Sequence, residues 1–513
     1  MPVNFPPVKR TNLAQCVMVL GTTSGAGKSW LTTALCRHYA RQGLKVAPFK
    51  AQNMSNNARV AASENGQGEI GSAQYFQALA ARAVPDVRMN PLLLKPEHDT
   101  HSQVVLMGQV DEALSKMPWR GRSAVVWPTI VKALDELIAE NDVVVIEGAG
   151  SPAEINLHSS DIVNMRVALH CNAACLLVAD IDRGGAFAHL YGTWALLPQN
   201  ERALIRGYVL NKFRGDAALL APAPQMLQDL TGVPTVAVLP MWWQHGLPEE
   251  DGIFDDRTLT AGAVTRTIAV IAYPRISNLD EFQPLKNVPG VRLQWARSPL
   301  GLAGLNAATD WIILPGSKHT SGDLAWLRQQ GLDAAIARHA GQGGAVLGIC
   351  GGLQMLGEAL IDPHGIDGNA PGLGLLPLVT VFAMDKTVKH TQACFDLQMG
   401  SASPWALLAG VNAQGYEIHN GQSAQHPAMA QAGDLARAVM PGDLAWQNAR
   451  GNVLGVYLHG LFEDANVLHA LFGATAPTPD SVFDGLADFV GLHFEPGFLE
   501  SLIALSPQPA LHG

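Results

Sequence analysis

The sequence lacks several features that would each define a class of protein. Its six cysteines form no Cys-x-x-Cys pair, which argues against a structural zinc site or a disulfide framework. Its longest apolar run, residues 167–179, is shorter than the roughly 18 residues of a membrane helix. Its 34 basic residues are outnumbered by 44 acidic ones, which disfavours nonspecific nucleic-acid binding. The acidic balance fits small-molecule substrates better. The N-terminus has no basic and apolar leader, so we expect a cytoplasmic protein.

The length of 513 residues exceeds the size at which one core keeps growing, so two domains are expected. In both halves, short apolar runs alternate with stretches of helical periodicity, which predicts an α/β fold with parallel sheets covered on both faces. A polar, turn-rich stretch interrupts this pattern. We therefore predict an N-terminal parallel-sheet domain, a linker and a C-terminal α/β domain, over residues 1–239, 240–265 and 266–513. The expected strands are residues 16–20, 44–49, 143–146, 174–179, 208–210, 235–239, 267–272, 291–296, 311–314, 345–349 and 453–458, with helices at 30–41, 130–140 and 324–339.

A glycine-rich segment, Gly-Thr-Thr-Ser-Gly-Ala-Gly-Lys-Ser over residues 21–29, joins the first expected strand to the first helix. Backbone N–H groups and the helix dipole at such a turn face phosphate oxygens, which predicts a P-loop for ATP. In this loop we expect Gly25 and Gly27 to cradle the phosphates, Lys28 to reach the β- and γ-phosphates, and Ser29 to bind Mg²⁺. Thr22 stands where the usual pattern has its first glycine.

Polar residues end three further strands of the first domain. Glu147 follows a buried strand and is expected to supply a second Mg²⁺ contact; otherwise it is a solvated charge. Asp180 and Asp182 could act through metal-bound water, orient the acceptor substrate, or form a turn. Asn211 is expected at the adenine base, with a loop cap as the alternative reading.

A second motif, Gly-Ile-Cys-Gly-Gly over residues 348–352, follows an apolar strand and opens a helix. Glycines around a sharp strand-to-helix turn predict a nucleophile elbow, with Cys350 as a thiolate favoured by the helix N-terminus. The attacked group would be an amide carbonyl. We expect its oxyanion to be bound by the backbone N–H groups of Gly351 and Gly316.

The base for this thiol must come from elsewhere in the chain. His459 follows the expected strand 453–458 and is our candidate. The alternative is His419, in the segment Gly-Tyr-Glu-Ile-His-Asn, which we otherwise expect to line the glutamine cleft or to be structural.

The elbow and the strand-end histidine together resemble the class I, or triad, glutamine amidotransferases. In that family a glutamate usually follows the histidine by two residues, but this place is Leu461, and Glu463 has a different spacing. In lacking this glutamate and in having an N-terminal loop like that of dethiobiotin synthetase, the sequence resembles the cobyrinate-amidating branch of the family. The resemblance covers nearly the whole chain and includes the strings at residues 21–29, 48–57, 147–157, 180–185, 247–251 and 415–419.

The resemblance implies a magnesium- and ATP-dependent enzyme that amidates the b, d, e and g carboxylates of adenosylcobyrinic acid a,c-diamide in adenosylcobalamin biosynthesis. Its substrates would be a corrinoid, glutamine and ATP, with no nucleic acid or membrane partner. We expect corrinoid contacts near the end of the second strand, at Lys50, Gln52, Asn53 and Asn56. Two alternatives stay open: the related enzyme that forms the a,c-diamide itself, and a nucleotide-switched P-loop ATPase without amidation activity.

Overall fold

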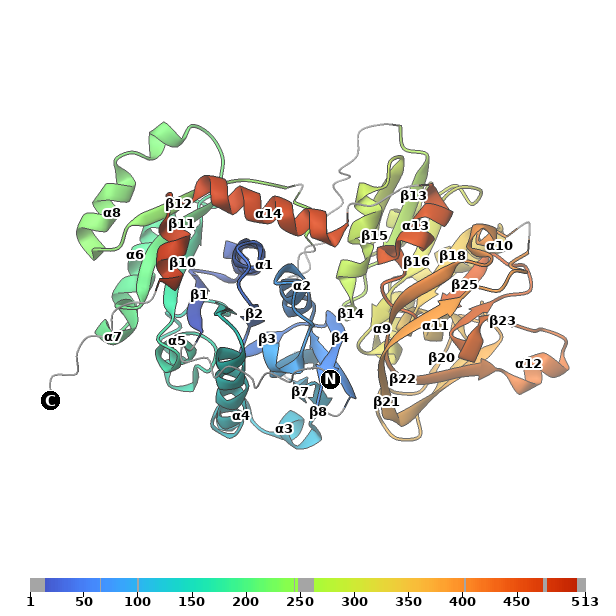
Figure 1. Cartoon of the computed structure of the whole chain (residues 1–513). Helices are drawn as coiled ribbons and strands as arrows, with labels where there is room; N and C mark the ends of the chain where they lie inside the picture. Colours follow the sequence, from blue (N-terminus) through green and yellow to red (C-terminus); the bar gives the residue numbers. More distant parts are fainter. Residues whose placement is uncertain are drawn as a thin grey trace, which may run out of the picture.

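The structure is a computed structural model, and it describes residues 14–64, 66–98, 101–243, 245–247, 263–400, 403–473 and 478–504. Two α/β units lie side by side in it (Figure 1). The expected linker at 240–265 lies largely outside the described residues, as does most of the string at 247–251. Within the described ranges, we find no helix with the length and apolarity that crossing a membrane requires.

The first unit is built on a six-stranded sheet whose strands are all parallel. Apolar side chains of its central strands are buried on both faces, as expected for a parallel sheet between helices. The P-loop strand lies in the middle of the sheet, so the carboxyl ends of its neighbours surround the loop. In spatial order the strands are β12 (Thr235–Pro240), β11 (Ile205–Phe213), β10 (Ala174–Asp180), β1 (Gln15–Gly21), β9 (Val143–Glu147) and β2 (Val46–Phe49).

Helices cover both faces of this sheet, and each face has its own apolar core. On one face the core contains residues of α4 (Trp119–Glu140), α5 (Met165–His170), α6 (Ala186–Leu196) and α8 (Ala223–Thr231). The opposite core contains residues of α1 (Lys28–Arg41). The predicted strands and the helix at 30–41 are therefore confirmed, with ends that differ by a few residues, whereas the helix predicted at 130–140 is longer and begins at Trp119.

Between β2 and α4 the chain forms two small sheets that the sequence pattern did not predict. The antiparallel pair β4 (Ala58–Ser63) and β5 (Gly66–Gly71) leads directly into α2 (Ser72–Ala80). The other small sheet contains β3 (Gln52–Met54), β6 (Leu92–His98), β7 (His101–Leu106) and β8 (Gln109–Val110), followed by α3 (Glu112–Lys116). These strands lie on the side of the first unit that faces the second (Figure 1).

The second unit contains a seven-stranded sheet. Five of its strands are parallel, and two at one edge are antiparallel. In spatial order they are β15 (Val291–Ala296), β13 (Arg266–Ile271), β16 (Trp311–Leu314), β18 (Ala345–Ile349), β25 (Val453–Val456), β24 (Ala445–Gln447) and β23 (Arg437–Met440). The five parallel strands were all predicted. The expected helix at 324–339 is instead two helices, α9 (Thr320–Gln329) and α10 (Leu332–Gly341), because Gly331 between them has φ of +72°.

Further elements of the second unit surround the end of its sheet where the cysteine lies. The elbow helix is α11 (Gly351–Leu356), and the turn before α9 contains β17 (Gly316–Ser317), which pairs with β14 (Ile276–Ser277). A long antiparallel pair, β21 (Leu378–Cys394) and β22 (Asn412–Gln425), belongs to a separate four-stranded sheet with β19 (Ala359–Ile361) and β20 (Ala370–Pro371). The remaining helices here are α12 (Pro427–Gln431) and α13 (Ala465–Phe472).

The C-terminal helices require a correction to the predicted domains. The sequence assigned residues 266–513 to the second domain, but α14 (Pro479–His493) and α15 (Phe498–Ile503) pack on the first. Phe483, Leu486 and Val490 of α14 are buried in the same core as the apolar face of α1. Figure 1 shows α14, in red, lying over the blue α1. Apolar periodicity predicts that a helix has a core face, but it does not say which core that face meets.

Candidate functional site

The glycine-rich loop has the backbone geometry of an anion cradle at the start of α1. Gly27 has φ of +98°, a left-handed conformation that favours glycine. A Cβ on Gly27 would lie 2.1 Å from Nδ2 of Asn211, so a side chain there would displace this amide from the carbonyl of Ala26. The Lys28 ammonium donates to the carbonyl oxygens of Thr23 at 2.9 Å and Gly150 at 3.2 Å, which holds it beside the loop.

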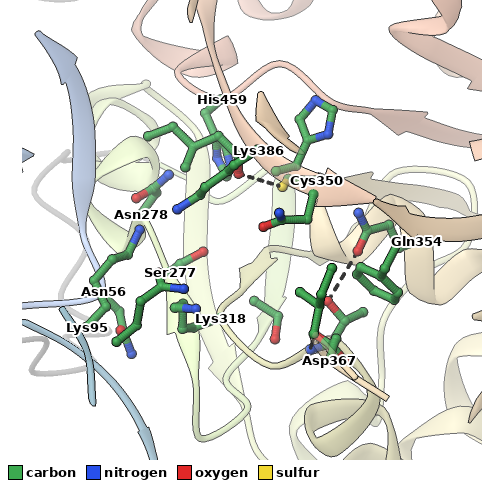
Figure 2. Close-up of a pocket in the computed structure, with 18 residues that line it drawn as sticks. Asn56, Lys95, Ser277, Asn278, Lys318, Cys350, Gln354, Asp367, Lys386 and His459 are labelled. Atoms are coloured by element: carbon green, nitrogen blue, oxygen red, sulfur yellow. Dashed lines mark hydrogen bonds between the residues drawn. The ribbon is translucent and has the colours of Figure 1, made fainter. Parts of the chain in front are cut away.

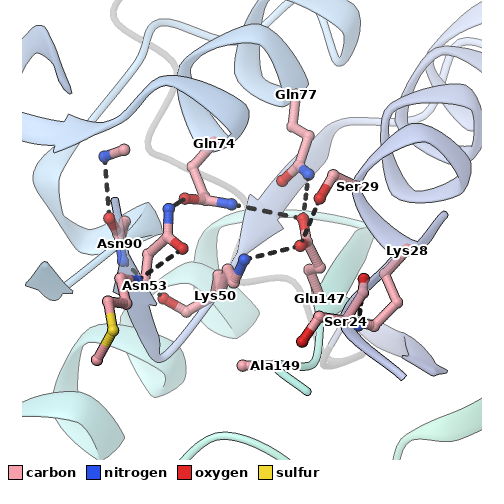
Figure 3. Close-up of polar contacts among 12 residues, drawn as sticks. Ser24, Lys28, Ser29, Lys50, Asn53, Gln74, Gln77, Asn90, Glu147 and Ala149 are labelled. Atoms are coloured by element: carbon pink, nitrogen blue, oxygen red, sulfur yellow. Dashed lines mark hydrogen bonds and ion pairs between the residues drawn. The ribbon is translucent and has the colours of Figure 1, made fainter. Parts of the chain in front are cut away.

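Glu147, at the end of β9, is the centre of a buried polar network beside this loop (Figure 3). Its Oε1 accepts hydrogen bonds from Ser29 Oγ and Lys50 Nζ, both at 2.8 Å. Its Oε2 accepts one from Gln77 Nε2 at 2.6 Å. Burial alone would raise the pKa of the Glu147 carboxyl, but Lys50 and these hydrogen bonds hold it below its ordinary value. The carboxylate is therefore ionised and aligned with Ser29.

The donors at this position fit the magnesium site that the sequence predicts. Mg²⁺ in nucleotide sites binds one or two protein oxygens and completes its shell with water and phosphate. The Ser29 hydroxyl and the Glu147 carboxylate lie within hydrogen-bond distance of each other at the loop. Among the described residues, no group of three or more His, Cys, Asp or Glu side chains is placed to hold a metal ion by itself. The Mg²⁺ ligands stay a prediction.

The other strand-end residues of the first domain support the loop or form ion pairs. Asn211 Nδ2 donates a hydrogen bond to the carbonyl oxygen of Ala26 at 2.9 Å, so this side chain stabilises the glycine-rich loop. Asp180 pairs with Lys212 at 3.2 Å, and Asp182 pairs with Arg214 near the surface. The predicted adenine contact of Asn211 is neither supported nor contradicted by these contacts.

The second centre is the elbow at Cys350, where the chain passes from β18 into α11. Cys350 has φ of +50°, a strained conformation for a residue with a side chain and one that is common at nucleophile elbows. The flanking glycines are sterically required, since a Cβ on Gly352 would lie 1.9 Å from the carbonyl oxygen of Leu314. The Cys350 side chain is buried, with its sulfur 3.6 Å from the carbonyl oxygen of Ile418.

His459 lies three residues after the end of β25, with its imidazole in contact with Cys350. Its Nδ1 is 3.2 Å from Oε1 of Glu281, and Oε2 of the same carboxylate accepts the Gly460 N–H at 2.9 Å. Burial lowers the pKa of His459, but the charge of Glu281 and the interaction with Cys350 outweigh it and raise the pKa to about 10. An imidazolium is therefore favoured at neutral pH, and this form stabilises a thiolate at Cys350.

Glu281 is a residue that the sequence analysis missed. It lies in the 3₁₀ segment η5 (Leu279–Asn287), and its side chain is fully buried. Glu463, the candidate nearer in sequence, instead binds Arg59 of the first domain at 2.6 and 2.7 Å. The adjacent pair Asp280 and Glu281 gives no spacing signal, because η5 reaches His459 only through the tertiary fold.

The two glycines predicted to bind the oxyanion, Gly316 and Gly351, lie beside His459 and Cys350. A Cβ on Gly316 would be 2.8 Å from Cε1 of His459, and a Cβ on Gly351 would be 2.8 Å from the backbone nitrogen of Ser317. The turn at Gly316 and the elbow thus meet with only glycine-sized gaps between them. Their role as oxyanion donors stays a prediction.

A cavity of about 80 Å³ opens at Cys350, and both domains line it (Figure 2). This exceeds several-fold the roughly 10–15 Å³ that one water needs. The first domain supplies Asn56 and Lys95, and the second supplies Gln354 and Lys386. His419 also lines the cavity, with Nδ1 at 2.9 Å from the Gly421 carbonyl oxygen and Nε2 at 3.1 Å from Glu417. Both of its ring nitrogens are engaged, which favours His459 as the base.

Ion pairs between the domains surround this cavity. Glu69 of β5 binds Lys95 at 2.7 Å and also binds Lys386 of the other domain. Lys318 of the second domain binds Glu97 of the first at 2.7 Å. Burial would raise the pKa of Glu69, but Lys386 and Lys95 lower it to about 2. The charged wall of the cavity is therefore shared between the two domains.

The structure separates the four predicted corrinoid contacts. Lys50 binds Glu147, and Asn53 Nδ2 donates to Gln74 at 3.0 Å in the same network. Gln52 lies on β3, next in sequence to Asn53. Asn56 is in the cavity with Cys350, and its Oδ1 is buried without a hydrogen-bond partner.

Comparison with known proteins divides the chain into two parts. The family described as "CobQ/CobB/MinD/ParA nucleotide binding domain" matches residues 17–243. The family described as "CobB/CobQ-like glutamine amidotransferase domain" matches residues 267–467. The first match contains the glycine-rich loop and Glu147, and the second contains Cys350, His459 and Glu281.

Full-length relatives are also similar over nearly the whole chain. The cobyric acid synthase of Polaromonas naphthalenivorans is 78% identical over 96% of this chain and 100% of its own length. The cobyric acid synthase of Albidiferax ferrireducens is 76% identical over 96% of this chain and 99% of its own. That of Variovorax paradoxus is 77% identical, with 96% and 99% covered.

Proposed function

The chain belongs to the cobyric acid synthase family, and from this premise we propose that it amidates a corrinoid in cobalamin biosynthesis by joining two reactions. Ammonia is released from glutamine at Cys350. A substrate carboxylate is activated by ATP at the glycine-rich loop and then takes up that ammonia. The acceptor is adenosylcobyrinic acid a,c-diamide, and the carboxylates are those of its b, d, e and g side chains.

One observation carries the glutamine half of the proposal: His459 lies beside Cys350 and is oriented by the buried carboxylate of Glu281. The Cys350 thiolate attacks the side-chain amide carbon of glutamine, and the N–H groups of Gly351 and Gly316 stabilise the oxyanion. His459 gives its proton to the departing nitrogen, the C–N bond breaks, and ammonia leaves. Water then attacks the thioester, His459 takes a proton from it, and glutamate is released with the thiolate restored.

The network around Glu147 supports the second half. A carboxylate oxygen of the corrinoid attacks the γ-phosphorus of ATP, ADP leaves, and an acyl phosphate forms. Ammonia then attacks the acyl carbon and phosphate departs, which leaves the amide. Lys28 stabilises charge on the phosphates. Ser29 and Glu147 would hold Mg²⁺, which supplies neutralisation of phosphate charge. Lys50 and Asn53 lie next to this centre, where an acceptor carboxylate would arrive.

The test separates the two centres with a Cys350→Ala variant. We expect it to lose amidation driven by glutamine but to keep amidation driven by an ammonium salt within about threefold, because the ATP centre is intact. Mass spectrometry of products formed from cobyrinic acid and from adenosylcobyrinic acid a,c-diamide identifies the acceptor. Formation of the a,c-diamide from cobyrinic acid as the main reaction would favour the alternative synthase. Full glutamine-driven activity of the variant would exclude Cys350 as the nucleophile.

A further inference from the structure

Arg59 of β4 connects the two centres through one buried set of contacts. Resting on the function proposed above, we propose that Arg59 is a positioning residue for glutamine hydrolysis, and that it makes the reactivity of Cys350 depend on occupancy of the nucleotide site. Arg59 belongs to the first domain, and its guanidinium lies among the second-domain residues that surround His459.

The guanidinium of Arg59 is 2% exposed and lies between two carboxylates of the second domain. Its Nε is 3.1 Å from Asp280 Oδ2, and Nη1 and Nη2 bind Glu463 at 2.7 and 2.6 Å. Asp280 is the residue before Glu281, in the same η5 segment. A shift of Arg59 therefore moves the backbone that carries the carboxylate at His459 Nδ1.

A second route from Arg59 leads to the same histidine through Tyr416. The Arg59 guanidinium lies 4.9 Å from the ring centre of Tyr416, within the range of a cation–π interaction. The Tyr416 ring is stacked on the His459 ring, with centres 5.4 Å apart and an angle of 20° between the planes. The backbones of Tyr416 and His459 also exchange hydrogen bonds, at 2.9 and 3.1 Å. Arg59 thus contacts one support of the imidazole, Tyr416, directly and the other, Glu281, through the adjacent Asp280.

The backbone beside Arg59 is fixed to η5 by a reciprocal pair of hydrogen bonds. Asn278 Oδ1 accepts the Ala58 N–H, and Asn57 Oδ1 accepts the Leu279 N–H, both at 2.9 Å. Asn278 has φ of +54°, so the start of η5 is a strained turn held by the first domain. The strand β4 and the segment before Glu281 consequently move together.

The opposite end of the connection is α2, a helix of nine residues. Ser72, at its first position, accepts a hydrogen bond from Arg59 Nε at 3.3 Å. Gln77, one and a half turns later, donates to Glu147 at 2.6 Å, and Gln74 approaches the same oxygen at 3.5 Å. One short, rigid helix therefore joins the proposed magnesium ligand to Arg59.

Occupancy of the nucleotide site must change the contacts of Glu147. Its two oxygens are already shared among Ser29, Lys50 and Gln77. Any cation that takes an oxygen of this carboxylate competes with Lys50 and with the Gln77 amide. Because Gln77 is fixed on α2, its rearrangement displaces the helix and, through Ser72, the Arg59 side chain. Differential contact of this kind is what coupling between two sites requires.

The experiment measures Cys350 itself rather than amidation. The alkylation rate of Cys350 by iodoacetamide is followed by peptide mass spectrometry, which separates it from the exposed Cys394. Wild-type enzyme is compared with and without adenylyl imidodiphosphate and Mg²⁺. We expect the nucleotide to change the wild-type rate at least threefold and the Arg59→Gln rate by less than 1.5-fold. Arg59→Lys, which keeps the charge but cannot bridge both carboxylates, should restore part of the response.

Arg37→Gln is the matched control, because Arg37 is also a buried arginine with ion pairs, to Asp480 and Asp484, but both partners lie in α14. This variant should keep the wild-type response. Should Arg59→Gln not fold, Glu463→Gln removes one of the two carboxylates at a side chain that is 30% exposed, and it should reduce the response. The proposal is overturned by a wild-type enzyme without a response, or by an unchanged response in the Arg59 or Glu463 variants. Failure of the wild type to amidate with either nitrogen source would instead overturn the proposed function.

Discussion

The role of Glu281 can be tested by one substitution that changes charge but hardly changes shape. In Glu281→Gln the side chain stays in place, and its amide oxygen can still accept the Gly460 N–H. The amide nitrogen then faces His459 Nδ1, at the position of an oxygen that is now 3.2 Å from it. A donor at that position forces Nδ1 to be an acceptor and places the imidazole proton on Nε2. This is the tautomer that cannot take a proton from the thiol or from water.

The size of the effect follows from the pKa of His459. Displacement of that pKa from 6.5 to about 10 corresponds to a preference for the imidazolium of roughly 5 kcal/mol. The charge of Glu281 is the first cause that raises it, ahead of Cys350. Loss of about 3 kcal/mol of this preference would correspond to roughly two orders of magnitude in the rate of glutamine hydrolysis, which is the effect we expect. Ammonia-driven amidation should stay within about threefold of wild type.

The assay measures glutamate release with glutamine as substrate, and product amide with an ammonium salt. Glu463→Gln is the comparison variant, because its carboxylate is nearer in sequence to His459 but binds Arg59. A Glu281→Gln enzyme that hydrolyses glutamine within threefold of wild type would refute the assignment. So would a larger loss in Glu463→Gln than in Glu281→Gln.

Three further predictions concern the loop, the C-terminal helix and a buried acid. Gly27→Ala should strongly weaken nucleotide binding, measured by calorimetry, while glutamine hydrolysis remains, because φ of +98° disfavours a side chain and a Cβ would displace the Asn211 amide. Nucleotide affinity within threefold of wild type would contradict this. Phe483→Ala should lower the free energy of unfolding of the first domain by about 3–5 kcal/mol. Heating should then remove ammonia-driven amidation before glutamine hydrolysis, and the reverse order would show that α14 stabilises the second domain. Burial raises the pKa of Asp323 to about 7, so its ionisation makes wild type less stable as pH rises from 3.8 through 7. Relative to wild type, the free energy of unfolding of Asp323→Asn should rise by about 2–3 kcal/mol between pH 5 and pH 8. The difference in melting temperature between the two proteins should therefore grow with pH, and a constant difference would exclude an effect of ionisation.

The sheets could be read from the sequence where strands are buried on both faces. Residues 311–314 and 345–349 are apolar runs, and the structure has strands over those same residues. The small strands between β2 and α4 were missed because their burial depends on tertiary partners. In β5, for example, Gly-Gln-Gly-Glu-Ile-Gly has one large apolar residue, and its buried Glu69 forms ion pairs with lysines of β6 and β21. No local pattern encodes that kind of burial.

The two centres are visible in the sequence, but the residues that support them are not. The glycine loop and the elbow at Cys350 are local motifs, because backbone geometry at a strand-to-helix turn needs particular neighbours in sequence. Glu281 stands 178 positions before His459 and contacts it through η5. Arg59 is farther still from Glu463 in sequence, with 404 positions between them. The fold of the second domain sets the first contact, and the docking of the two domains sets the second; a single sequence reveals neither.

Several buried or half-buried ion pairs cross the interface between the domains. One small apolar cluster spans it, built from Val60 and Leu93 of the first domain and Tyr416 and Ile418 of the second. The remaining cross-domain contacts include ion pairs of Glu69, Glu97 and Arg59 with lysines or carboxylates of the second domain. Buried ion pairs add little net stability over apolar packing, but loss of one partner is costly. Such an interface is sensitive to displacement of a single charged side chain, which an apolar core is not. The cavity at Cys350 is lined by this surface, so its shape depends on how the first domain holds its own charged residues.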